Sequence, residues 1–197
     1  MKISSQWCAI AIAAACALAA ATPAHAQKKA QGPFREGFWI GVGLGYGGAT
    51  ISCSGCTDNS RLGAPTFTLR MGGTPSRQVL IGGELNAWSR SESGVTETVG
   101  DMSAVALWYP GARSPVFLKG GVGVVVYQAN SSPKLESEGF GLNLGAGIDL
   151  YTGRSFSITP FVTYITALGG NLKVGGTDTG FAIKPNMIEV GITATWH

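Results

Sequence analysis

Alternation with a period of two is the feature that most constrains how this chain can fold. From 37 to 47 the even positions are apolar, and the odd positions from Gly41 onward are glycine: Phe38, Ile40, Val42, Leu44 and Tyr46 against Gly41, Gly43, Gly45 and Gly47. In a strand this period places the apolar side chains on one face and the glycines on the other. A helix would scatter both sets around its axis, and each glycine would cost about 1 kcal/mol. The segment is therefore predicted to be a β-strand.

The same alternation recurs along the rest of the chain. It is clearest at 139–151 and 188–196. The complete set of predicted strands is 37–47, 66–73, 78–88, 100–109, 116–128, 139–151, 155–165 and 188–196, with no helix. Three connections are tight (74–77, 110–115 and 152–154), and the other four are longer and rich in Ser, Gly, Thr and Asn. Eight strands with short turns on one side and long loops on the other predict an antiparallel up-and-down transmembrane β-barrel.

Alternation alone leaves the direction of the apolar face open. A soluble lipocalin-like barrel turns its apolar residues inward, and Gly37-Phe38-Trp39 matches the G-x-W that opens that family. Its water-facing surface would then be rows of glycine, with only 13% charged residues in the chain to keep it from associating. In lipid, the glycine rows point into a narrow interior and the apolar rows meet hydrocarbon. The sequence therefore favours a barrel embedded in a membrane.

Aromatic residues support the membrane interpretation because they gather near both ends of the predicted strands. One group is Phe38, Trp39, Trp108, Tyr109, Phe117, Tyr151, Phe156 and Trp196; the other is Tyr46, Phe67, Trp88, Tyr127, Phe140 and Tyr164. Along tilted strands the two groups are separated by about 25 Å, the height of the lipid-facing band of such barrels. Parity directs some of them, including Trp39 and Tyr151, inward.

The first 26 residues are predicted to be a cleaved signal peptide. A basic start precedes a small-residue apolar stretch, and Ala24-His25-Ala26 is an A-x-A cleavage signal. Residues 27–36 are polar and are interpreted as a leader. The barrel domain is then 37–197.

Two cysteines, Cys53 and Cys56, remain after removal of the signal peptide. Export to an oxidising compartment favours a disulfide between them, which would pin the first long loop. A structural zinc site needs four ligands, and no helix follows the pair to activate a thiol.

Over 37–197 the sequence resembles the small eight-stranded outer-membrane barrels of the OmpA and OmpX type. The resemblance rests on the signal peptide, the eight alternating strands and a last strand that ends with Trp196 on the apolar face. It implies location in the outer membrane of a Gram-negative-type envelope, with contact to outer-membrane lipid. The last strand also resembles the signal read by the barrel assembly machinery, although His197 rather than an aromatic is the final residue.

Inward-facing charges are the clearest candidates for a functional group of residues. Parity places five of them on the polar face: Arg70, Glu84, Lys119, Asp149 and Glu189. Charges of both signs on neighbouring strands favour a salt-bridged interior over a proton or ion path. Matching the ends of two adjacent strands predicts that Lys119 pairs with Asp149.

No enzymatic, cofactor, metal or nucleic-acid function is predicted. The single His of the exported chain is His197, on the periplasmic side, which does not fit a surface hydrolase. A net charge of +3 is spread along the chain without a basic cluster. The preferred hypothesis is a non-enzymatic surface protein whose loops serve envelope integrity, adhesion or partner contact. The alternative is a carrier of lipid or a small hydrophobic molecule, which needs room beside inward glycines such as Gly43 and Gly145.

Overall fold

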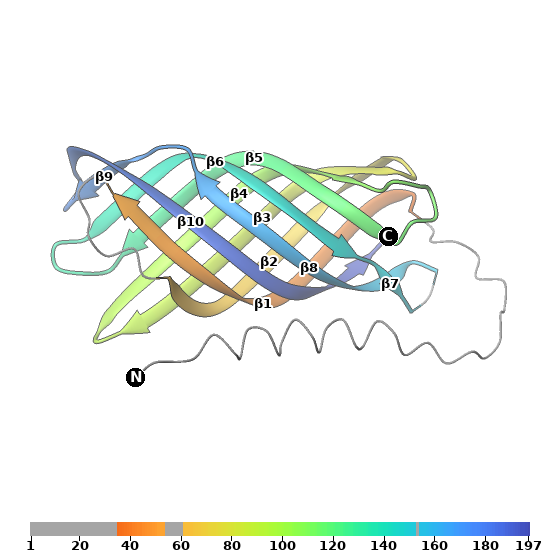
Figure 1. The fold of residues 1–197 in the computed structure, drawn as a ribbon, viewed down its shortest axis with the longest axis horizontal. Coiled ribbons are helices and arrows are strands. Elements are labelled where there is room, and N and C mark those ends of the chain that lie inside the picture. The colour runs from red at the N-terminus through yellow and green to blue at the C-terminus, as the bar shows by residue number, and fades with distance from the viewer. Residues whose placement is uncertain (1–34, 54–60, 153) are drawn as a thin grey trace. The chain divides into compact units, whose positions relative to one another are not determined.

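The computed structural model describes residues 35–53, 61–152 and 154–197, and it folds them into an antiparallel ring of tilted strands (Figure 1). The strands are β1 (Gly37–Cys53), β2 (Leu62–Ser76), β3 (Val79–Glu92), β4 (Val95–Trp108), β5 (Val116–Ala129), β6 (Leu135–Ile148), β7 (Leu150–Tyr151), β8 (Phe156–Ala167), β9 (Asn171–Val174) and β10 (Thr177–Trp196). In the described part of the chain no helix is long and apolar enough to cross a membrane. The predicted signal peptide and nearly all of the leader lie outside the described residues.

Pairing of the first strand with the last closes the ring. β1 pairs with β2 on one side and with β10 on the other. The short β7 pairs with β8, and the short β9 lies between β6 and β10. The wall therefore has eight strand positions, which confirms the predicted eight-stranded antiparallel barrel.

The two faces of the wall follow the predicted parity. Leu44, in the apolar row of β1, is 71% exposed on the outside, whereas Gly43 beside it is buried. The apolar rows of β6 and β10 likewise face outward, as Leu144 and Val190 show. An outer surface of large apolar side chains around a buried polar interior is the arrangement that lipid requires.

The strands run further than predicted at the end of the barrel away from the termini, here called the hairpin end. Ser93 and Gly94 join β3 to β4 with φ of 51° and 81°, and Gly175 and Gly176 join β9 to β10 with φ of 57° and 84°. Two-residue turns with positive φ match the twist of paired strands. The predicted long loops at 89–99 and 166–187 are therefore wrong, because most of each segment is paired strand. The dipeptides at the turns were the signal that parity alone overlooked.

The interior is layered along the barrel axis. The inner cluster, at the end where the termini lie (the termini end), consists of Trp39, Leu80, Val105, Leu107, Tyr109 and Phe117. The outer cluster, toward the hairpin end, consists of Ala49, Ala64, Trp88, Val99, Val125, Tyr127, Ala129, Ile165, Ala167, Ile183 and Met187. Buried polar and charged side chains, here called the polar belt, lie between the two. The lumen is thus filled with side chains at both ends.

Candidate functional site

Glu84 on β3 is the centre of the polar belt. Its Oε1 accepts hydrogen bonds from Lys119 Nζ at 2.5 Å, Asn86 Nδ2 at 2.9 Å and Asn143 Nδ2 at 3.0 Å. The two amides also donate to Asp101 Oδ2, at 3.1 and 3.0 Å, and so bridge two carboxylates. A buried ion pair is favourable only when further hydrogen bonds surround it. This network supplies them at Oε1 of Glu84, whereas Oε2 has no partner among the described residues.

Arg70 and Glu189 border the same belt on neighbouring strands. Arg70 lies opposite Glu84 in the β2–β3 register, yet its Nη2 donates to Thr193 Oγ1 at 2.7 Å and Thr195 Oγ1 at 3.1 Å. Glu189 is buried opposite Thr163, whose Oγ1 accepts from Lys119 Nζ at 2.9 Å. The structure thus buries all five predicted charges, and it brings Glu84 and Lys119 together.

The predicted pairing of Lys119 with Asp149 is wrong. β5 begins at Val116 opposite Ile148, so Lys119 lies opposite Gly145. Asp149 lies four residues further along, about 13 Å at the rise of a strand. The residues after Ile148 extend past the start of β5 and pair with β8 instead. Pairing the ends of the two predicted strands placed Asp149 level with Lys119. In the structure the chain continues past the start of β5 after Ile148, so Asp149 lies nearer the termini end than Lys119 does.

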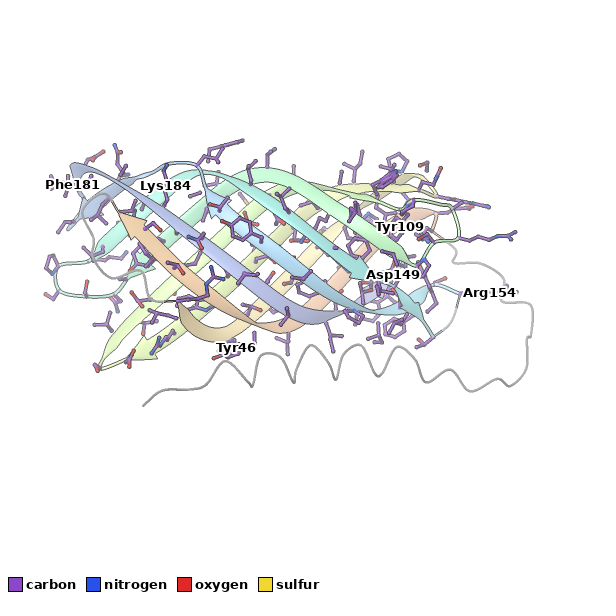
Figure 2. The ribbon with its side chains drawn as sticks, in the orientation of Figure 1. Tyr46, Tyr109, Asp149, Arg154, Phe181 and Lys184 are labelled. Atoms are coloured by element: carbon purple, nitrogen blue, oxygen red, sulfur yellow. The ribbon has the colours of Figure 1, made fainter. Side chains whose placement is uncertain are left out.

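Asp149 belongs to a second polar group at the termini end, where Figure 2 shows it close to Tyr109. Its carboxylate accepts from Tyr109 Oη at 2.7 Å, Tyr151 Oη at 3.2 Å and Thr159 Oγ1 at 2.8 Å. Burial raises the pKa of the Tyr109 phenol, and the charge of Asp149 raises that pKa further. Tyr109 therefore stays protonated and remains a donor to Asp149.

Arg35, just before β1, ties this end of the barrel together. Its guanidinium lies 3.6 Å from the centroid of the Tyr109 ring and donates to the carbonyls of Arg77, at 3.2 Å, and Ser114. Arg77 and Ser114 belong to two different turns. The next residue, Glu36, pairs with Arg77 at 2.6 Å. A residue assigned to the leader by sequence is thus a fully buried clamp across the termini end.

Loss of this clamp should loosen the turns without unfolding the wall. Arg35→Ala is expected to speed amide hydrogen exchange at Ser114 and Tyr109 by about tenfold or more, because hydrogen bonds from a buried cation are lost. Arg35→Lys should recover little, since an ammonium cannot stack on the Tyr109 ring while it donates hydrogen bonds to the carbonyls of both turns. Arg113→Ala is the control, because Arg113 is exposed in the same turn. Equal exchange in the Arg35 and Arg113 variants would contradict the clamp.

The last two residues divide between the two faces of the wall. Trp196 points outward and stacks on Phe156 with ring centroids 5.1 Å apart, whereas the His197 ring lies 5.7 Å from that of Tyr151. Burial lowers the pKa of His197, so its ring is neutral at pH 7. The last outward-facing residue is thus aromatic even though the last residue of the chain is not.

The hairpin of β9 and β10 is held by its own side chains. Asp178 accepts from Gly180 N at 2.8 Å and from Asn171 Nδ2 at 3.0 Å, and the first of these bonds lowers the Asp178 pKa most. Thr179 Oγ1 donates to Leu172 O at 2.7 Å. The hairpin presents Phe181 to solvent with 64% of its surface exposed, near Lys184 at the hairpin end (Figure 2). The predicted Cys53–Cys56 disulfide falls outside the described residues, since Cys56 and the Cys53 side chain are not described.

Several residues of the polar belt were not predicted. Asn86, Asp101 and Asn143 all lie on inward positions of their strands. Strand parity is enough to place the two asparagines inside, because Asn86 shares the parity of Glu84 and Asn143 lies between Leu142 and Leu144 of the apolar row. Among the described residues, no group of three His, Cys, Asp or Glu side chains could hold a metal ion.

No protein-family model matches the chain, and no curated protein sequence matches it. Solved structures do match. Ail, the attachment invasion locus protein of Yersinia pestis, is 16% identical with a TM-score of 0.52 over 82% of this chain and 99% of that one. Neisserial surface protein A (NspA) is 13% identical, with a TM-score of 0.53 over 79% and 95%. The outer membrane protein OprG from Pseudomonas aeruginosa is 15% identical, with a TM-score of 0.50 over 84% and 98%.

These similarities show the fold. The chain has the architecture of the small outer-membrane barrels, as its resemblance to the OmpA and OmpX type predicted. The outer membrane is where such a barrel, with its apolar outer wall, resides. In this fold the longer excursions beyond the apolar band face the cell exterior, and here these excursions are the extended strands and hairpins of the hairpin end. The hairpin end is therefore extracellular and the termini end is periplasmic.

Proposed function

We propose that this protein is a non-enzymatic outer-membrane barrel that presents rigid β-hairpins at the cell surface for contact with a partner. The observation that carries the proposal is the β9–β10 hairpin. Asp178 and Thr179 fix its backbone, and Phe181 is 64% exposed at the hairpin end, seven residues beyond the outward-facing Ile188 of the same strand. A large exposed aromatic on a rigid scaffold is the usual centre of a protein contact. Adhesion and envelope integrity are both roles that such a contact can serve.

The filled lumen supports a role at the surface over transport. The inner cluster lies at one end of the lumen and the outer cluster at the other, with the hydrogen-bonded polar belt between them. An eight-stranded barrel has an interior just wide enough for side chains to fill. This arrangement favours a scaffold over a channel.

The alternative function, a carrier with an apolar ligand in the lumen, requires space beside inward glycines. A Cβ added at Gly145 would lie 2.7 Å from Val162 O, and one added at Gly43 would lie 2.7 Å from Ile192 O. These glycines permit close packing of the wall instead of leaving room for a ligand. No observation on the described residues therefore favours the carrier.

Export and assembly belong to the same proposal. We infer that residues 1–26 are removed on export and that Cys53 and Cys56 form a disulfide beside the hairpin end. We also infer that the assembly machinery reads the outward row of β10 up to Trp196. Trp196 packs on Phe156 at the lipid face, where a recognition signal for this machinery is expected.

A photo-crosslinking amino acid at position 181 tests the surface contact. Phe181 and Phe38 are equally exposed, at 64% and 63%, but they lie at opposite ends of the barrel. In intact cells, position 181 is expected to give a discrete protein adduct, and position 38 is expected to give adducts with lipid only. The charge change Lys184→Glu should reduce the adduct at 181. An adduct of equal yield at both positions, or none at 181, would contradict the proposal.

A further inference from the structure

Glu189 on β10 is a buried carboxylate without a partner in the polar belt. It is 1% exposed, and neither of its carboxylate oxygens accepts a hydrogen bond from the described residues. β1, which pairs with β10 here, presents only glycine to the lumen at 41, 43, 45 and 47, so it offers no side-chain donor. Buried charges in proteins are paired or bind metal ions, because an isolated one is costly. Glu189 therefore needs either a positively charged partner or a proton.

Arg70 lies too far toward the termini end to be that partner. A Cβ added at Gly41 would lie 2.9 Å from Arg70 Nε, whereas one added at Gly47 would lie 3.2 Å from Glu189 Cβ. The two glycines are six residues apart on β1, which is about 20 Å at the rise of a strand. The arginine thus serves the threonines at its own level and leaves Glu189 unpaired.

The buried charges of the barrel do not balance. Among the described residues, the buried charged side chains are three cations and four carboxylates: Arg35, Arg70 and Lys119 against Glu84, Asp101, Asp149 and Glu189. Arg35 and Asp149 lie together at the termini end, and Lys119 pairs with Glu84. Asp101 accepts from neutral donors. One negative charge is therefore in excess, which one monovalent cation would neutralise and a divalent cation would overcompensate.

Further oxygens without donors lie around Glu189. Glu84 Oε2 and Asn143 Oδ1 have no partner among the described residues. Asn143 and Glu189 flank β8, opposite positions two residues apart. Thr66 lies beside Glu189, since a Cβ added at Gly47 would also lie 2.9 Å from Thr66 Cγ2. Its hydroxyl is neutral, so a hydrogen bond to Glu189 would leave the charge uncompensated. Hard cations bind several oxygen ligands of these kinds at once.

A proton is the other means of neutralising Glu189. It would remove the charge, but one O–H group donates to one acceptor and would leave the remaining oxygens unpaired. A monovalent metal cation neutralises the charge and binds several oxygens together. The number of unpartnered oxygens therefore favours the metal cation.

We propose that the polar belt holds one monovalent metal cation, sodium or potassium, bound by the Glu189 carboxylate. Asn143 Oδ1, Glu84 Oε2 and Thr66 Oγ1 are the other oxygens of the belt that would complete its coordination. The cation would tie β10 to β2, β3 and β6 through the lumen. Because the unfolded chain has no such site, binding would stabilise the folded barrel. This structural role is separate from the surface contact proposed above.

The test is urea unfolding of the full barrel in phosphatidylcholine vesicles at pH 7, with sodium chloride replacing choline chloride at constant ionic strength. Above the dissociation constant, each tenfold rise in sodium should raise the folding equilibrium constant about tenfold, as one site requires. Glu189→Gln should abolish this dependence, because the amide carries no charge. Asp149→Asn is the matched control, since it removes a buried carboxylate outside the belt and should retain the dependence. Heat-modifiable migration in gels verifies that each variant is folded.

A crystal grown in rubidium chloride supplies a second readout, because one anomalous peak is expected beside the Glu189 carboxylate. Equal stability of the wild type in sodium, potassium and choline chloride would overturn the proposal. If that salt-independent stability also fell as the pH rose, a proton on Glu189 would replace the metal cation. A calcium dependence that sodium does not reproduce would overturn the proposal as well. So would a sodium dependence that persists in Glu189→Gln, because the ion would then bind elsewhere.

Discussion

Lys119→Met is expected to destabilise the folded barrel by about 3 to 5 kcal/mol, because it leaves the Glu84 carboxylate buried without its cation. Both side chains are almost fully buried, at 2% and 0% exposure, so water cannot replace the lost partner. Glu84→Gln should cost a similar amount by leaving the Lys119 ammonium unpaired. The double variant should recover much of the loss, since it buries neither charge alone. Equilibrium unfolding in lipid vesicles measures all three.

A second cycle provides the control for this coupling. Lys119→Met combined with Asp149→Asn should give additive losses, because Asp149 accepts from Tyr109, Tyr151 and Thr159 instead of from Lys119. Additive losses in the Lys119 and Glu84 cycle would show that the ion pair adds nothing beyond packing. Coupling to Asp149 would mean that the β5–β6 register is displaced.

Parity predicted which side chains point into the barrel, because successive side chains of a pleated strand must alternate between its two faces. Once Leu44 faces lipid, Gly43 must face the lumen, and the same rule places Arg70, Glu84 and Lys119 inside. The closed ring could also be predicted, since eight paired strands satisfy every backbone group in a membrane only when the first meets the last.

Parity could not predict which inward side chains meet. Glu84 on β3 and Lys119 on β5 are separated by β4, so their contact crosses the lumen rather than following the wall. Such contacts depend on the stagger of all the strands between them. Stagger in turn depends on where each turn falls, and the turn at Ser93 and Gly94 was not recognised from the sequence. The overlong loops follow from the missed turn, whereas the Lys119–Asp149 error has a separate cause, because Val116 pairs with Ile148 and not with Tyr151.

The layering of the lumen also lay beyond the sequence, because parity tells which side chains are inward but not which of them pack into one cluster. Trp88 and Trp108 show that a band of aromatic residues at one level can mix the two faces of the wall. Both were assigned to aromatic bands at the ends of strands, yet Trp88 is 1% exposed inside the outer cluster and Trp108 is 50% exposed on the lipid face. Trp88 also donates from Nε1 to Gly47 O at 3.2 Å. One tryptophan is core and the other is a lipid contact.

Trp88→Ala is therefore expected to lower the free energy of unfolding by about 3 to 5 kcal/mol, the usual cost of a large cavity in a packed core. Trp108→Ala should cost less than half as much, because acyl chains move into the space that the side chain leaves. Urea unfolding in lipid vesicles, followed by the remaining tryptophan fluorescence, compares the two variants directly. Equal losses would mean that the outer cluster is not packed around Trp88.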